Sequence, residues 1–197
     1  MQSPWFKRAL PAAALLALAA WGIRPLQVQN EEMSPSITPG DWVLWLPLAP
    51  RQGDVVLLQD PSDPSRRVLR RAIAAPGQSL TLSKPGLALD GQPWRWREMG
   101  RDADRVAYSE QDAWLVQTAD RRFDEASVTL NAEEGWMLLA DHRDGPVDSR
   151  WWGAIPSSDI QGRVWLRIGA KDAWRGVLSW GAKDGPWIPP SKVPAQD

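Results

Sequence analysis

The sequence predicts an all-β domain, built from antiparallel strands and carried on one N-terminal transmembrane helix. Three observations support this fold class. Beyond the first 24 residues, short apolar runs are separated by Pro, Gly and Asp, which is typical of strands joined by turns. No segment of that region shows a sustained helical period. The one long apolar stretch lies at the N-terminus, where positive charge precedes it.

Residues 1–24 are interpreted as a membrane anchor. Lys7 and Arg8 precede an uncharged run, Ala9 to Ile23, and Arg24 follows it. As a helix this run spans about 22 Å, which matches a hydrocarbon core of ~30 Å only if the flanking basic side chains snorkel to the interfaces. The sequence Ala-Leu-Ala at 17–19 leaves open a cleavable secretory signal. In either case the positive charge before the run places the following residues on the non-cytoplasmic side.

The body of the chain, residues 25–170, contains several predicted strands. Each is a short apolar run, in part alternating with polar residues, and each is bounded by turn-forming residues. The dipeptide Asp90-Gly91 at the end of one run is typical of a tight hairpin turn. The predicted strands are 42–46, 54–58, 68–69, 79–82, 87–89, 136–139 and 162–168.

Two segments lack a strand pattern. Residues 97–125 carry many charges of mixed sign with little periodicity, and we interpret them as a solvated insertion in the body. Residues 171–197 are rich in Trp and Pro and are predicted to form an irregular C-terminal strap. The expected organisation is therefore an anchor, one β domain with a charged insertion, and a tail.

The composition excludes several kinds of site. The chain has no Cys and a single His, which removes disulfides, a cysteine nucleophile and a zinc site of the usual ligand types. A formal net charge of −1 gives no basis for nucleic-acid binding. We therefore predict no metal, no cofactor and no nucleic-acid partner.

Four segments stand out, in this order along the chain: VQNEEMSPSITPGD (28–41), RQGDVV (51–56), VLRRAIAAPG (68–77) and ADHRDGPVDSRWWG (140–153). In sequence and order they resemble the boxes of the signal peptidase I family. The last box, with Asp148-Ser149-Arg150 at its centre, is the most specific. Any single match is a common turn or surface sequence, so the shared order and spacing carry the resemblance.

The resemblance implies a serine endopeptidase that removes leader sequences from exported proteins. Its members use a Ser hydroxyl as the nucleophile and a Lys amine as the general base. By motif, the nucleophile position here is Glu32 and the general-base position is Arg70. A carboxylate cannot form the usual acyl ester, and a guanidinium stays protonated, so neither residue suits its role.

Other positions of the implied site are retained in part. The oxyanion position is Asn30, whose amide can still donate a hydrogen bond. Asp148 and Arg150 keep the family residues in the last box. Met33 and Pro35 are the positions that the resemblance assigns to substrate binding.

The two dyad substitutions complement each other in charge. Glu32 and Arg70 would meet where the Ser–Lys dyad lies, and such a pair can be bidentate and charge-assisted. The alternative is that two drifting positions acquired opposite charges by chance. Ala140 and Pro146 also replace a Gly and a Ser of the family pattern beside the base.

A relocated catalytic triad is a further alternative. Ser34 or Ser36 would act as the nucleophile, with His142 and Asp148 as its partners. Ser36 already matches a Ser or Thr of the family pattern, and His142 lies at a position that varies between Asn and His. We therefore expect no relocated triad.

We predict a degenerate, membrane-anchored, signal-peptidase-like protein. It would bind an extended leader peptide or membrane-inserted peptide along a strand edge, or partner an active signal peptidase. The alternatives are an active signal peptidase I-type endopeptidase and a structural subunit of a membrane assembly.

The expected location is the plasma membrane, with the body on its non-cytoplasmic side. A second location stays open. His142, the Met-x-Pro-Ser sequence of the first box and the Pro-rich tail also resemble the second subunit of the mitochondrial inner membrane peptidase. That resemblance implies the intermembrane-space side of the mitochondrial inner membrane.

Overall fold

The computed structural model describes residues 22–82, 86–102, 105–119 and 128–169. In this part of the chain the protein is mostly β, and its helical elements are α2 (Ser149–Trp152) and the short 3-10 helix η1 (Ser157–Asp159). The predicted all-β class is confirmed. No helix within these ranges is long and apolar enough to cross a membrane. The predicted anchor up to residue 21 and the predicted tail lie outside the described residues.

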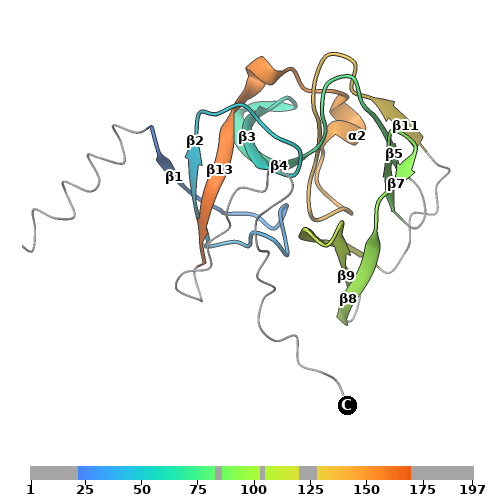
Figure 1. The fold of residues 1–197 in the computed structure, drawn as a ribbon. Helices are drawn as coiled ribbons and strands as arrows, with labels where there is room; N and C mark the ends of the chain where they lie inside the picture. The colour runs from blue at the N-terminus through green and yellow to red at the C-terminus, as the bar shows by residue number, and fades with distance from the viewer. Residues whose placement is uncertain (1–21, 83–85, 103–104, 120–127, 170–197) are drawn as a thin grey trace, which may run out of the picture.

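The largest sheet has six antiparallel strands (Figure 1). β4 pairs with β3 over most of the length of β3, whereas β12 pairs only with Arg71–Ala74 at the end of β4. In spatial order the strands are β1 (Arg24–Gln27), β2 (Trp42–Leu46), β13 (Ile160–Ile168), β3 (Val55–Asp60), β4 (Asp63–Ala74) and β12 (Met137–Leu139).

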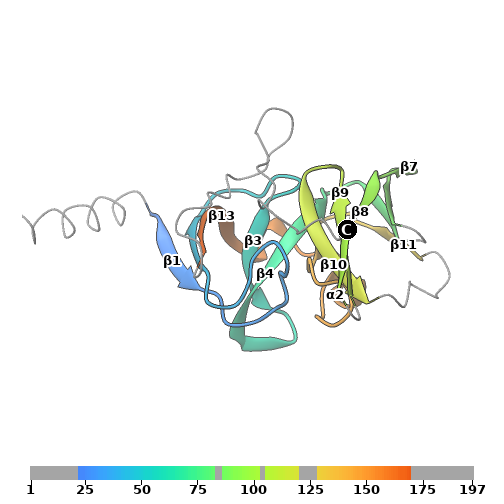
Figure 2. The ribbon, with the colours of Figure 1, turned by 90° about the horizontal axis from the view of Figure 1, so that it is seen from below.

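Two smaller antiparallel sheets lie on the same side of the large one (Figures 1 and 2). At the predicted hairpin, Asp90 and Gly91 have φ values of 49° and 74°, as a type I′ turn requires. One sheet contains β10 (Trp114–Ala119), β9 (Arg105–Glu110) and β8 (Trp96–Asp102). The other contains β11 (Val128–Asn131), β5 (Ser79–Leu82), β6 (Leu87–Leu89) and β7 (Gln92–Pro93).

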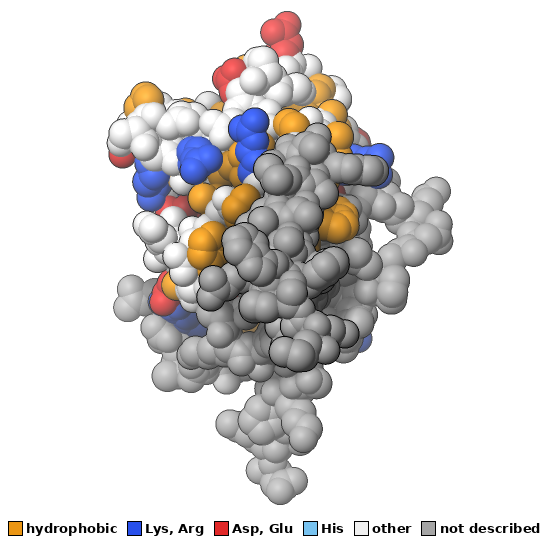
Figure 3. Space-filling model, turned by 90° about the vertical axis from the view of Figure 1, so that its left-hand side faces the viewer, with side chains coloured by type: hydrophobic (Ala, Val, Ile, Leu, Met, Phe, Trp, Pro, Cys, Tyr) orange, Lys and Arg blue, Asp and Glu red, His pale blue; other side chains and the backbone are white. Residues whose placement is uncertain are grey.

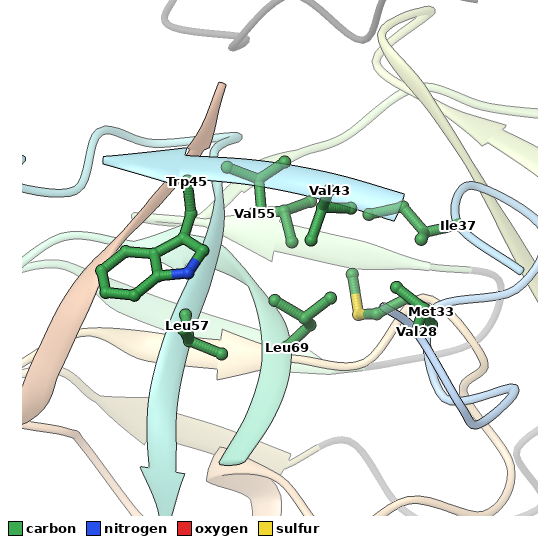
Figure 4. Close-up of a cluster of buried hydrophobic side chains, with 9 residues drawn as sticks. Val28, Met33, Ile37, Val43, Trp45, Val55, Leu57 and Leu69 are labelled. Atoms are coloured by element: carbon green, nitrogen blue, oxygen red, sulfur yellow. The ribbon is translucent and has the colours of Figure 1, made fainter. Parts of the chain in front are cut away.

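Three clusters of buried apolar side chains form the core, and β3 contributes to two of them. Val55 and Leu57 pack in one cluster with Met33 of the loop after β1 (Figure 4). Val56 and Leu58 alternate with them and pack in a second cluster. The strand is thus covered on both faces, which explains its continuous apolar sequence. The third cluster joins the large sheet to both smaller ones.

The prediction of a solvated insertion at 97–125 is wrong where the structure describes it, because most of 97–119 lies in β8, β9 and β10. Val106 and Val116 are fully buried, and so is the charged Glu110. The exposed charges that suggested a solvated segment, such as Arg97 and Glu98, lie on β8. The pairing of β8 with β9 shifts register after Glu98, which interrupts the alternation that would have indicated a strand.

The side of the large sheet that carries β1 has exposed apolar side chains. Trp42 on β2, Trp165 on β13 and Leu48 beyond β2 are all exposed. Arg24 on β1 places its guanidinium carbon 5.3 Å from the centroid of the Trp45 ring. Seen from this side, described hydrophobic and basic side chains are interspersed (Figure 3). This mixed surface lies where the chain leaves the predicted anchor.

Candidate active site

Glu32 lies on the loop between β1 and β2, and its buried neighbours fix this loop. Met33 is almost fully buried in the first core cluster, and its carbonyl accepts a hydrogen bond from the Ile37 amide at 2.8 Å. The ends of the loop are joined by a hydrogen bond from the Val28 amide to the Asp41 carbonyl at 2.8 Å. Met33, the predicted substrate-binding residue, is therefore a core residue, and the adjacent Glu32 keeps a partly exposed side chain.

Glu32 and Arg70 form the ion pair that the sequence predicts. Nη1 of Arg70 lies 2.9 Å from Oε2 of Glu32, and the Arg70 side chain is 0% exposed while that of Glu32 is 15% exposed. The pair is not bidentate, because the second carboxylate oxygen, Oε1, is bound by Nη1 of Arg66 at 3.2 Å. The Glu32 carboxylate is thus shared between two arginines.

Arg66 connects this pair to a second carboxylate. Its Nη2 lies 2.7 Å from Oδ2 of the buried Asp60. The hydrogen bond with Asp60 raises the pKa of the Arg66 guanidinium, against the opposing effect of partial burial. Arg66 therefore stays charged. The sequence analysis did not identify Arg66 as a residue of this site. The signal that was present is its spacing from Arg70 on β4, since residues four apart on a strand point to the same face.

The remaining donors of Arg70 bind backbone carbonyls. Nε and Nη2 donate to the Val147 carbonyl at 3.2 and 2.7 Å, and Nη1 also donates to the Leu69 carbonyl at 2.6 Å. The guanidinium carbon lies 5.3 Å from the centroid of the Trp152 ring. A guanidinium held this way is a fixed cation and cannot accept a proton from a nucleophile.

The predicted oxyanion residue makes a contact of the opposite kind. Oδ1 of the exposed Asn30 accepts a hydrogen bond from the Glu32 amide at 3.3 Å. The Glu32 carbonyl accepts from the His142 amide at 3.0 Å, which ties this loop to the last box. The Glu32 backbone N–H, which already has this acceptor, is not directed at a developing oxyanion.

Asp148 and Arg150 brace the last box. Arg150 donates from Nε and Nη2 to the two carboxylate oxygens of Asp148, each at 2.8 Å. Asp148 is fully buried, caps α2 by accepting from the Arg150 amide, and also accepts from the Ala140 amide at 3.0 Å. These contacts give both residues a structural part in shaping the loop that carries Val147.

Two buried ion pairs join the last box to neighbouring strands. Arg71 on β4 binds both oxygens of Asp141, at 2.8 and 2.5 Å. Arg143 binds both oxygens of Glu110 on β9, at 2.9 and 2.7 Å. Glu110 is a second residue that sequence reasoning missed, and nothing in a single sequence separates it from the exposed charges around it.

The geometry gives no support to a relocated triad. Both carboxylate oxygens of Asp148 are engaged by Arg150, and one also binds the Ala140 amide. The Ser36 hydroxyl donates to the Leu115 carbonyl at 2.8 Å. Pro35, the other predicted substrate-binding residue, forms a bridge to Val116 on β10.

Comparison with known proteins identifies a matching family. A family model described as "Signal peptidase, peptidase S26" matches residues 2–168. Signal peptidase I of Pseudomonas fluorescens is 22% identical over 192 residues, which cover 77% of this chain and 68% of the relative. The protein described as inactive signal peptidase IA of Staphylococcus aureus (strain Mu50) is 25% identical over 152 residues, which cover 75% of this chain and 79% of the relative.

A solved structure was also matched. The crystal structure of a signal peptidase I from Enterococcus faecalis V583 superposes with a TM-score of 0.40 at 20% sequence identity. The superposition covers 59% of this chain and 97% of that one.

Proposed function

The chain belongs to the signal peptidase S26 family, and we propose that it is a non-catalytic member that binds leader or membrane-inserted peptides, or assists an active signal peptidase. The observation that carries this proposal is the ion pair between Glu32 and Arg70. It occupies the two positions that, by motif, hold the nucleophile and the general base.

Neither partner can take over the missing chemistry. The Glu32 carboxylate is bound by two guanidinium groups, and attack on a peptide carbonyl would require it to leave both. The product of such an attack is a mixed anhydride, a poor intermediate for peptide hydrolysis. Arg70 donates from all three of its nitrogens and stays protonated, so it cannot act as the general base. The S. aureus relative described as inactive supports the view that the family includes non-catalytic members.

Features for peptide binding remain beside the ion pair. Within the described residues, β12 covers the outer edge of β4 only from Arg71 onward, so the preceding part of that edge has no paired strand. An extended peptide can add to such an edge by main-chain hydrogen bonds. Val147 is exposed and its carbonyl accepts a hydrogen bond from Arg70, so this residue offers an apolar contact next to Arg70.

The proposed location is a membrane surface. We propose that residues 1–24 anchor the protein and that the body lies on the non-cytoplasmic side of the plasma membrane, or on the intermembrane-space side of the mitochondrial inner membrane. The exposed Trp42 and Trp165 and the basic Arg24 support this, because Trp and basic residues favour membrane–water interfaces.

A cleavage assay with a leader substrate that contains Ala-x-Ala tests the proposal. We expect no turnover above background, while an active signal peptidase I run in parallel cleaves the substrate. Turnover that persists in Ser34→Ala and Ser36→Ala variants but disappears in Glu32→Ala would show an active enzyme instead. Binding of the same peptide, or co-purification with an active signal peptidase, is the positive result that we expect.

A further inference from the structure

The site that holds the Glu32 side chain has the chemistry of a carboxylate receptor. Nη1 of Arg70 and Nη1 of Arg66 lie 2.9 and 3.2 Å from the two different oxygens of the same carboxylate. Charge-assisted hydrogen bonds of this kind select for both the charge and the shape of the anion. Both arginines come from β4, where residues four apart point to the same face of the strand.

Arg70 depends on this carboxylate more than Arg66 does. In the described part of the chain, Glu32 is the carboxylate paired with Arg70, whose other hydrogen bonds go to the neutral carbonyls of Leu69 and Val147. Arg66 would keep its contact with Asp60 if Glu32 left. A fully buried cation without an anion is strongly unfavourable. The site therefore needs a carboxylate, but that carboxylate can belong to another molecule.

Glu32 is the exchangeable partner of the two. It lies on a loop with its side chain partly exposed. The Arg70 side chain is completely buried, and its strand, β4, is hydrogen-bonded to β3. The carbonyl of the exposed Val147 also accepts from the Arg70 guanidinium, so a ligand at Arg70 would lie close to this apolar residue.

We propose that Arg66 and Arg70 bind the C-terminal carboxylate of a peptide that ends in small residues, such as a cleaved leader, and that this carboxylate displaces Glu32. The inference rests on the proposed peptide binding and specifies what is bound. The carbonyl of an internal peptide bond can accept a hydrogen bond from Arg70 but cannot neutralise its charge, whereas the carboxylate of a free peptide end can do both. The site thus prefers the product of a signal peptidase to its substrate.

The test compares fluorescent peptides that differ only at their end. The first is a leader-derived peptide that ends in Ala-x-Ala with a free carboxylate, and the second is the same peptide with a C-terminal amide. The third is amidated and carries Asp in place of the last Ala, which separates a side-chain carboxylate from the chain end. Fluorescence anisotropy gives each dissociation constant for the native full chain and for Glu32→Ala, Arg66→Gln and Arg67→Gln. Arg67 is the exposed neighbour of Arg66 on β4 and serves as the matched control.

In Glu32→Ala, the free acid should bind about tenfold more tightly than the amide, which corresponds to about 1.4 kcal/mol. In the native protein the acid should still be preferred, by a smaller factor, because Glu32 competes for the arginines. Arg66→Gln should reduce the preference, and Arg67→Gln should leave it unchanged. Urea unfolding of each variant checks that it is folded, and if Glu32→Ala is not, the acid-to-amide ratio of the native protein decides.

The outcomes separate this inference from the proposed function. Equal binding of the acid and the amide overturns carboxylate recognition but leaves peptide binding intact. Binding of neither peptide overturns both proposals. A preference for the Asp peptide over the free acid also overturns the inference, because it assigns the site to an acidic side chain within a peptide.

Discussion

Glu32 and Arg70 should be energetically coupled, and a double-mutant cycle with Glu32→Gln and Arg70→Met measures that coupling. Glu32→Gln keeps the shape of the side chain but leaves the fully buried Arg70 charge without its anion. Breaking a buried ion pair from one side costs ~3–5 kcal/mol. Glu32 is partly exposed and Arg70 keeps two backbone carbonyls, so we expect the lower end, about 3 kcal/mol.

Arg70→Met should cost less, because Glu32 keeps its contact with Arg66 and with solvent. The change removes the donors to the carbonyls of Val147 and of the buried Leu69, and an unsatisfied buried acceptor costs about 1–3 kcal/mol. The double variant leaves no charge unpaired at Arg70. Its loss of stability should therefore fall short of the summed single losses by ~1–2 kcal/mol, within the range for residues in contact.

Urea unfolding followed by tryptophan fluorescence measures the four free energies, provided that the slope against urea stays the same. The exposed ion pair between Arg97 and Asp112, at 3.1 Å, is the matched control. A cycle of Arg97→Gln and Asp112→Asn should give a coupling below ~0.5 kcal/mol. Additive effects of the Glu32 and Arg70 changes, or equal coupling in the two cycles, would refute the reasoning.

Three further predictions concern activity, the buried network and the N-terminus. Restoring the dyad residue types with Glu32→Ser and Arg70→Lys should destabilise the protein by less than the two single changes added together. It should give at most trace cleavage, because Pro146 still replaces a Ser beside the base and catalysis tolerates little misplacement; robust turnover contradicts this. Glu110→Gln should lower the free energy of unfolding by about 3 kcal/mol, because Arg143 is buried and loses its bidentate partner; a loss below about 1 kcal/mol contradicts it. The mature protein should keep its original N-terminal residues and resist carbonate extraction, whereas a mature N-terminus near residue 20 would indicate a removed signal.

Much of the fold could be predicted because apolar runs and turn residues are local signals. Each of the predicted strands overlaps a strand of the structure, and the hairpin at Asp90 and Gly91 needs only two residues to specify its turn. The sheet of β8, β9 and β10 was not predicted. Its charged residues are visible in the local sequence, whereas the residues that neutralise the buried charges are distant in sequence. From the sequence Glu110 resembles a solvated charge, because its partner Arg143 lies 33 residues later in the chain.

The ion pair could be predicted because motif positions bring Glu32 and Arg70 together although they lie 38 residues apart. The sharing of the carboxylate with Arg66 was missed, because the predicted strand covered only residues 68–69, whereas β4 begins at Asp63 and places Arg66 on the same face as Arg70. The burial of Met33 was missed for a different reason. A motif assigns a residue to a site, but only packing decides whether its side chain faces a ligand or the core.

The contacts of Arg70 link three parts of the chain that are far apart in sequence. Glu32 and Val147, its partners, lie 38 and 77 residues away, so one side chain closes two long loops in a protein that has no cysteine. A lysine ammonium, with a single nitrogen, could not reach both partners in this forked geometry. Unlike a disulfide, this ion pair does not depend on the redox state of the compartment, and the proposed displacement of Glu32 by a carboxylate would open it. At the position where an active peptidase accepts a proton from its nucleophile, this chain holds a cation that links the strand to two loops.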